Sequence, residues 1–150
     1  MESPSTSSFD ILLCQTMKYN DSIKIVLNTL VEVYHYTRIF TTSKKYKMCT
    51  VRLSIPFTGN NGGLGTRSRI LLFLDEELIC DGSIHNGTSW ELKPLQLYGE
   101  IFDLKPGEHT VKLKCCVNGG ELFIPHYNLS QIENTIKPEL SGKMVVLGFN

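Results

Sequence analysis

The chain has 150 residues, of which 41% are hydrophobic and 20% are charged, and its 15 basic and 15 acidic residues cancel. This composition is typical of a globular protein and excludes extended disorder. A neutral chain also lacks the positive charge that binds nucleic acid or an anionic membrane surface. Because residues 1–8 are polar, we expect a flexible N-terminal tail followed by a single domain over residues 9–150. The tail has no signal-peptide pattern and no apolar run could span a bilayer, so we expect no membrane insertion.

The cysteines indicate a reducing compartment. Their number is odd and their spacing is not that of a metal site; they are Cys14, Cys49, Cys80, Cys115 and Cys116. Adjacent Cys115 and Cys116 point to opposite faces of an expected strand, so they cannot share one tetrahedral site. Free thiols without an export signal favour the cytoplasm, or a particle that is assembled there.

Short blocks in which apolar and polar residues alternate predict strands, and no stretch has a helical period. In residues 47–57, Val51, Leu53 and Ile55 share one face of the expected strand, while Arg52 lies on the other. One dry face and one wet face are typical of an antiparallel sandwich. In chain order, strands are expected over residues 10–15, 23–27, 30–41, 47–57, 67–74, 77–81, 91–98, 100–104, 109–117, 121–124 and 143–149.

Turn residues separate these strands at frequent intervals. The clearest turn lies at Pro106 and Gly107, because proline restricts φ and glycine accommodates the positive φ of a type II turn. Hairpins are also expected at residues 75–77 and 118–120. Together these features predict an all-β fold, an antiparallel β-sandwich with jelly-roll topology.

The candidate ligand-binding residues lie in two longer irregular stretches expected at residues 58–66 and 125–138, and in a polar loop expected at residues 84–90. The first stretch is glycine-rich, but it lacks the lysine and the following helix of a phosphate-binding P-loop. The four histidines lack the spacing of a metal site. We therefore predict no catalytic residue, no metal and no cofactor. The residues predicted to contact a ligand are Asn60, Asn61, His85, Asn86, Trp90, His126 and Tyr127.

The aromatic residues of the second half have two interpretations. They could form a platform on which a sugar stacks, since an aromatic ring presents an apolar face to a pyranose. In a sandwich, however, such rings also belong to the core or to a subunit interface. The residues concerned are Trp90, Tyr98, Phe123 and Tyr127.

Three segments resemble the jelly-roll heads of the C1q/tumour-necrosis-factor-like superfamily, in the versions found in viral and phage fibres and in small eukaryotic proteins. They are residues 69–75 (RILLFLD), 104–113 (LKPGEHTVKL) and 143–149 (KMVVLGF). The resemblance spans roughly residues 22–149. It implies that the first and last strands pair, and that the aromatic face of their sheet is buried at a threefold axis. It also makes His109 a structural residue at the start of a strand.

The leading hypothesis is a non-enzymatic jelly-roll module that forms a compact homotrimer and has a structural or attachment role. Its partner is then another copy of itself, with a protein or glycan ligand in addition. An alternative is a lectin-like head that binds carbohydrate or a receptor with its loops. A metal-dependent enzyme is a third hypothesis. The sequence also leaves a Ser/His/Asp or Cys/His triad open, because the members of a triad are close only in space.

Overall fold

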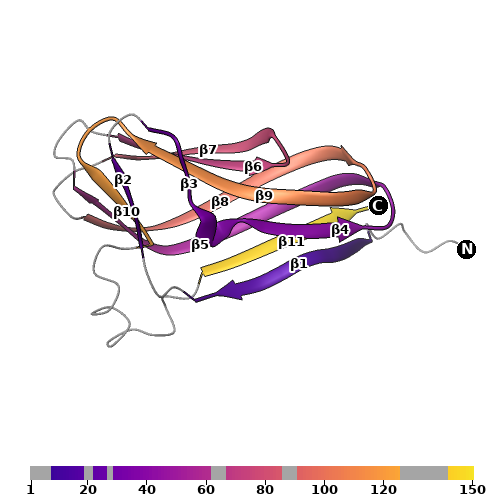
Figure 1. Cartoon of the computed structure of the whole chain (residues 1–150). Helices are drawn as coiled ribbons and strands as arrows, with labels where there is room; N and C mark the ends of the chain where they lie inside the picture. Colours follow the sequence, from indigo (N-terminus) through magenta and orange to yellow (C-terminus); the bar gives the residue numbers. More distant parts are fainter. Residues whose placement is uncertain (1–7, 19–21, 27–28, 62–66, 86–90, 126–141) are drawn as a thin grey trace, which may run out of the picture.

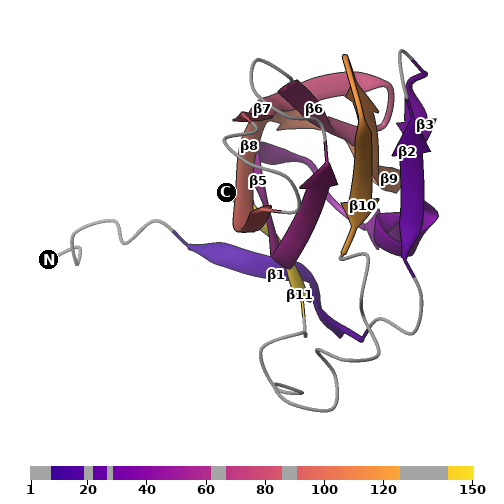
Figure 2. The same cartoon turned by 90° about the vertical axis from the view of Figure 1, so that its left-hand side faces the viewer.

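The computed structural model describes residues 8–18, 22–26, 29–61, 67–85, 91–125 and 142–150, and these residues form two antiparallel sheets packed on each other (Figure 1). Most of the longer strands run along the long axis of the molecule, and β2 and β10 lie at the end that faces the viewer in Figure 2. The strands are β1 (Phe9–Met17), β2 (Ile23–Val26), β3 (Val31–Glu32), β4 (Arg38–Thr42), β5 (Tyr46–Asn61), β6 (Arg67–Leu74), β7 (Glu77–His85), β8 (Glu91–Leu104), β9 (Gly107–Val117), β10 (Glu121–Ile124) and β11 (Gly142–Phe149).

Each sheet is built around one long strand, after which we name it. The β5 sheet has the order β1-β11-β5-β10-β2, and β8 pairs with the other edge of β5. The β9 sheet has the order β3-β9-β6-β7, and β4 also pairs with β9. Strand β5 is 16 residues long. It can therefore pair with β8 along one edge while β11 and β10 follow each other along the opposite edge.

The predicted fold class, an all-β antiparallel sandwich, is confirmed, and the strand order is compatible with a jelly roll. The pairing of the first and last strands is also observed. Strand β1 pairs with β11 from Phe9 opposite Phe149 to Met17 opposite Gly142. Residues nearly a full chain length apart in sequence are therefore neighbours in the β5 sheet.

The core lies between the two sheets and is formed by alternate residues of each strand. Burial of each large apolar side chain contributes about 1.5–3 kcal/mol relative to exposure, so this double layer is the main source of stability. Strands β5 and β9 supply much of it, through Cys49, Val51, Leu53, Ile55, Val111, Leu113, Cys115 and Val117, all at most 1% exposed. The predicted inward alternation of β5 is confirmed at Val51, Leu53 and Ile55.

The prediction of one strand over residues 30–41 is wrong. Strands β3 and β4 are separated by a 3-10 turn over Tyr34–Tyr36. In a straight strand the two tyrosines would point to the same side. The turn instead buries Tyr36 completely and leaves Tyr34 60% exposed. Burial of the Tyr36 ring thus takes precedence over continuous pairing with β9.

Two further strand boundaries differ from the prediction, because a glycine and several polar residues expected to interrupt strands belong to them. Residues 91–98 and 100–104 are not separate strands, since β8 is continuous through Gly99. A Cβ atom at Gly99 would lie 2.7 Å from Cγ1 of Ile79, so the missing side chain allows β7 to pack closely on β8. Residues 58–61, expected to be irregular, extend β5, and Asn60 lies opposite Glu91.

Of the three predicted hairpins, the one at residues 75–77 joins two paired strands, β6 and β7. Gly107 has the predicted positive φ, 125°, but its turn joins β8 of the β5 sheet to β9 of the β9 sheet. Residues 118–120 likewise join β9 to β10 of the other sheet. The prediction of paired hairpins at these two turns is therefore wrong. A sandwich needs connections that cross between its sheets, and local turn chemistry does not distinguish them from hairpins.

Candidate functional site

The seven residues predicted to contact a ligand have different positions relative to the described structure. Asn60 is only 2% exposed, and its side-chain amide donates a hydrogen bond to the hydroxyl of Ser68. Asn61 and His85 are the last residues of β5 and β7. The other four lie outside the described residues; they are Asn86, Trp90, His126 and Tyr127.

The strand ends that carry the predicted loops are close to one another. His85 lies opposite Arg67 at the free ends of β7 and β6. Asn60 lies opposite Glu91 at the start of β8, and Asn61 lies opposite Glu121 at the start of β10. The strand ends on either side of residues 62–66 and 86–90, which belong to two of the three predicted loops, therefore lie at one end of the sandwich (Figure 1).

The surface of most interest is an apolar patch on the outer side of the β5 sheet, bordered by a polar row of Thr16, Lys143, Ser54 and Gln96. Outward positions of β1, β11, β5 and β8 should be polar if this side faced water, as in the usual antiparallel sandwich. Phe9, Ile11 and Phe102 are instead 53%, 65% and 66% exposed. We call this surface the apolar face, and define it as Phe9, Ile11, Met48, Tyr98, Phe102, Val145, Leu147 and Phe149.

The pairing register places these side chains in rows across four strands. Phe9 lies opposite Phe149, which lies opposite Met48, which in turn lies opposite Phe102. The rings of Phe9 and Phe149 are tilted with centroids 5.9 Å apart, a favourable arrangement for aromatic pairs. In the next row Ile11 lies opposite Leu147. Side chains at opposite positions of paired strands contact each other, so the face is continuous.

Two charged residues within the apolar face are held by Tyr98. The Tyr98 hydroxyl donates a hydrogen bond to Oε1 of Glu100 at 2.9 Å. The guanidinium carbon of Arg52 lies 5.6 Å from the centre of the Tyr98 ring. Partial burial and the bond to Glu100 raise the pKa of the Tyr98 hydroxyl. Of the predicted platform aromatics, Tyr98 therefore lies on this face, where it is 45% exposed.

A small hollow of about 110 Å³ opens on the same side of the β5 sheet. Its lining residues are Thr50, Arg52, Val145 and Leu147. Thr50 points outward but is only 6% exposed, because it lies at the base of this depression. The apolar face thus contains a recess that a side chain of a partner could enter.

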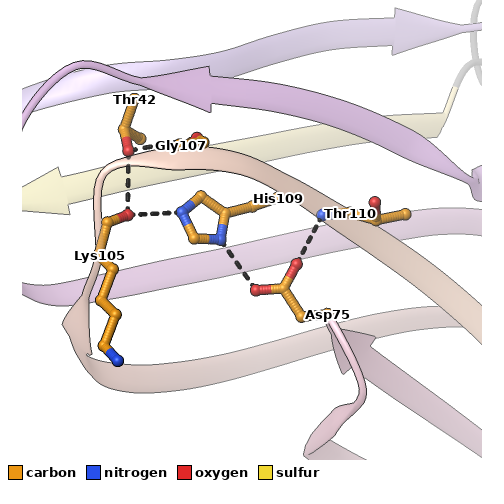
Figure 3. A network of polar contacts seen from close by, with 6 residues as sticks. All are labelled: Thr42, Asp75, Lys105, Gly107, His109 and Thr110. Atoms are coloured by element: carbon orange, nitrogen blue, oxygen red, sulfur yellow. Dashed lines mark hydrogen bonds and ion pairs between the residues drawn. The ribbon is translucent and has the colours of Figure 1, made fainter.

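His109 belongs to a polar network beneath the turn that joins β8 to β9 (Figure 3). Its Nδ1 lies 2.8 Å from Oδ2 of Asp75, and its Nε2 lies 2.6 Å from the carbonyl oxygen of Lys105. The other oxygen of Asp75, Oδ1, accepts a hydrogen bond from the backbone N–H of Thr110 at 2.9 Å. The Thr42 hydroxyl donates to the same Lys105 carbonyl at 3.2 Å. We call these five residues the His109 clip.

The contacts of the His109 clip indicate that it stabilises the fold. Both imidazole nitrogens of His109 face oxygen acceptors, and the residue is only 7% exposed. Asp75 has a positive φ of 56°, which directs its carboxylate from the β6–β7 turn toward β9. The clip therefore joins two turns that are distant in sequence. It agrees with the structural role expected of His109.

The described residues offer few reactive groups. Among them, no three His, Cys, Asp or Glu side chains lie close enough together to hold a metal ion. Burial raises the pKa of the Cys49 thiol to about 12 and also raises that of Cys115, so both thiols stay protonated. Cys116 is partly exposed while Cys115 is buried, which confirms that the two point to opposite faces.

No family model matches the chain, and no curated protein matches it in sequence. Within the described part of the chain, no helix has the length and hydropathy needed to cross a membrane.

Most of the apolar face cannot be predicted from the sequence, although one strand carries an indication of it. In residues 143–149 both sets of alternate positions are apolar, at Met144 and Val146 and again at Val145 and Leu147. A strand that is apolar on both sides is usually covered on both sides. Strand β11 packs one side into the core, so its other side indicates a surface that a partner covers.

Proposed function

We propose that the chain is a non-enzymatic assembly module that forms a compact homotrimer through the apolar face and has a structural or attachment role. The observation that carries the proposal is the row of apolar side chains across β1, β11, β5 and β8. Contiguous apolar surface of this kind marks interaction sites, because its exposure to water is unfavourable. The resemblance to trimeric jelly-roll heads implies burial of the sheet that holds the first and last strands.

A second copy of the chain is a suitable occupant for this face. The chain carries no net charge, so copies do not repel one another. The charged groups inside the face, Arg52 and Glu100, both contact Tyr98, so each keeps one favourable contact when the face is covered. Exposed aromatics and a recess on the same surface allow one copy to insert a ring into another, and such anchors dominate interface energies.

The test is the mass of the protein in solution, measured by light scattering after size exclusion and by native mass spectrometry. We expect a trimer at micromolar concentration. The variant Ile11→Lys introduces a charge into the apolar face and should raise the concentration needed for assembly by about 30-fold or more, the loss expected at an interface hot spot.

The chain offers a matched control for this variant. Ile39 in β4 is also a strand isoleucine, 58% exposed against 65% for Ile11, but it lies in the β9 sheet. Ile39→Lys should leave the trimer intact. A wild-type protein that stays monomeric at micromolar concentration, or equal dissociation by both variants, would count against assembly through the apolar face.

The second candidate function is a lectin-like head that binds a ligand with its loops. It is supported by the strand register, which brings together the ends of β5, β6, β7 and β8 next to two of the three predicted loops. This function is compatible with assembly, because the apolar face lies on the side of the β5 sheet. A glycan array that shows no binding, together with unchanged ligand binding by the variant Trp90→Ala, would count against this function.

A further inference from the structure

A polar groove lies on the outer side of the β9 sheet, opposite the apolar face. It has a volume of about 580 Å³ and lies where β6, β7 and β9 run side by side. Its lining includes Arg67, Arg69, Asp81, Ser83 and Asn118. Small-molecule sites usually measure about 300–1,000 Å³, so the groove is large enough for a monosaccharide or disaccharide.

The strand register explains why these side chains share the groove. Arg67 and Arg69 are two positions apart in β6 and therefore point to the same side of the sheet. Ser83 lies directly opposite Arg69 in the neighbouring strand, and Asp81 follows two positions away on the same side. On the other edge of β6, the Asn118 side-chain oxygen accepts a hydrogen bond from the backbone N–H of Arg67 at 2.6 Å.

The two arginines differ in their contacts. The guanidinium of Arg69 forms an ion pair with Asp81, with Nη2 and Oδ2 2.7 Å apart. Among the residues that the structure describes, none forms an ion pair with the guanidinium of Arg67. Two positive charges and one negative charge leave the groove with an excess of one positive charge. Arg67 is therefore the group that can receive an anion, by a planar pair of N–H donors.

We propose that this groove binds a sugar that carries one negative charge, as a carboxylate or a sulfate ester. The anionic group pairs with Arg67. The sugar hydroxyls donate to the Asp81 carboxylate and exchange hydrogen bonds with Ser83 and with the Asn118 amide. Because Asp81 is already paired with Arg69, one negative charge on the ligand balances the groove, and a second would have no cationic partner among the lining side chains.

The proposal deepens the second candidate function and is independent of assembly. The groove and the apolar face lie on the outer sides of different sheets, so a trimer formed through the apolar face leaves its grooves accessible. Three grooves on one particle would then bind a multivalent surface with greater avidity than one groove binds a free sugar.

The experiment is a titration of the full-length protein followed by amide chemical shifts in NMR spectra. The probes are methyl glucuronide, glucose 6-sulfate, glucose 6-phosphate and the neutral methyl glucoside. We expect one or both monoanionic sugars to shift the amides of β6 and β7 near Arg67 and Ser83, and to bind at least about tenfold more tightly than the neutral sugar, the effect of one charge-assisted hydrogen bond. The stronger of the two identifies the anionic group as carboxylate or sulfate.

Variants decide whether the groove is responsible. Arg67→Gln should weaken binding of the monoanionic sugar by about tenfold, and Ser83→Ala should weaken binding while the anion preference remains. Lys105→Gln removes the same charge from the exposed β8–β9 turn and should leave binding unchanged. Equal binding of the neutral sugar, tighter binding of the phosphate ester, or an unchanged affinity in Arg67→Gln would overturn the proposal. The mass of each variant, measured in parallel, keeps this result separate from that of the assembly test.

Discussion

Replacement of Asp75 by alanine tests the role of the His109 clip in the stability of the fold. The carboxylate of Asp75 accepts from His109 and from the Thr110 backbone, so the variant removes both contacts at once. Residue 75 also has a φ of 56°, in the left-handed region. Aspartate and asparagine tolerate this region better than alanine does, so the substitution has a backbone cost as well.

The expected loss of folding stability is the sum of a backbone cost and the loss of two hydrogen bonds. Alanine in the left-handed region costs about 1 kcal/mol. Each hydrogen bond contributes roughly 1 kcal/mol net, and the buried ring of His109 would lose a partner that water replaces poorly. The side chain of Asp75 is 46% exposed, however, so water can solvate part of the vacated site. We expect a total loss of about 2–3 kcal/mol in the free energy of unfolding.

Asp103→Ala is the matched control. Asp103 also has a positive φ, 59°, but its carboxylate makes an exposed ion pair with Lys45 at 3.7 Å. It should therefore lose only the backbone part, about 1 kcal/mol. Urea denaturation followed by circular dichroism measures both variants, and melting temperature should fall by about 2–4 °C per kcal/mol in a chain of this size. If Asp75→Ala is no more destabilised than Asp103→Ala, the clip contributes nothing measurable.

Two further predictions concern the core. Gly99→Ala should destabilise the fold by about 1–3 kcal/mol in the same urea assay, because the new Cβ would lie 2.8 Å from the backbone oxygen of Ile79. Unchanged stability would show that β7 and β8 can move apart at no cost. Cys49 should resist alkylation in the native protein while exposed Cys14 reacts, as peptide mass mapping would reveal. Since the Cys49 pKa rises from 9.0 to about 12, its contribution to stability is intact below pH 9 and is lost as pH rises toward 12. Native-state labelling of Cys49 at pH 8 would contradict this.

Much of the fold could be predicted because it depends on local patterns. Alternation in β5 identified Val51, Leu53 and Ile55 as core residues, and turn chemistry identified the positive φ of Gly107. The turn at Gly107 does not reveal which strands pair on either side of it. The connection at Gly107 crosses between sheets, and that choice depends on contacts with β4, β5 and β6 that are distant in sequence.

The candidate surfaces were harder to predict for a similar reason. Phe9 and Phe102 lie 93 positions apart in the chain, and only the pairing of β1, β11, β5 and β8 places them in one row. The clip has the same character, since Asp75 and His109 meet through two separate turns. The residues predicted to contact a ligand differ from their neighbours only in side-chain chemistry, and of these only Asn60 has a described side chain, which is buried.

The position of β11 has a consequence for the order of events during synthesis. Strand β11 lies between β1 and β5, so β1 has no partner in the β5 sheet until residues 142–149 leave the ribosome. Until then the edge of β5 along residues 48–54 is also open, and such edges are prone to pair with the wrong chain. Phe149, Leu147 and Val145 complete the rows of the apolar face. The apolar face, through which we propose that copies associate, is therefore incomplete until β11 pairs with β1 and β5.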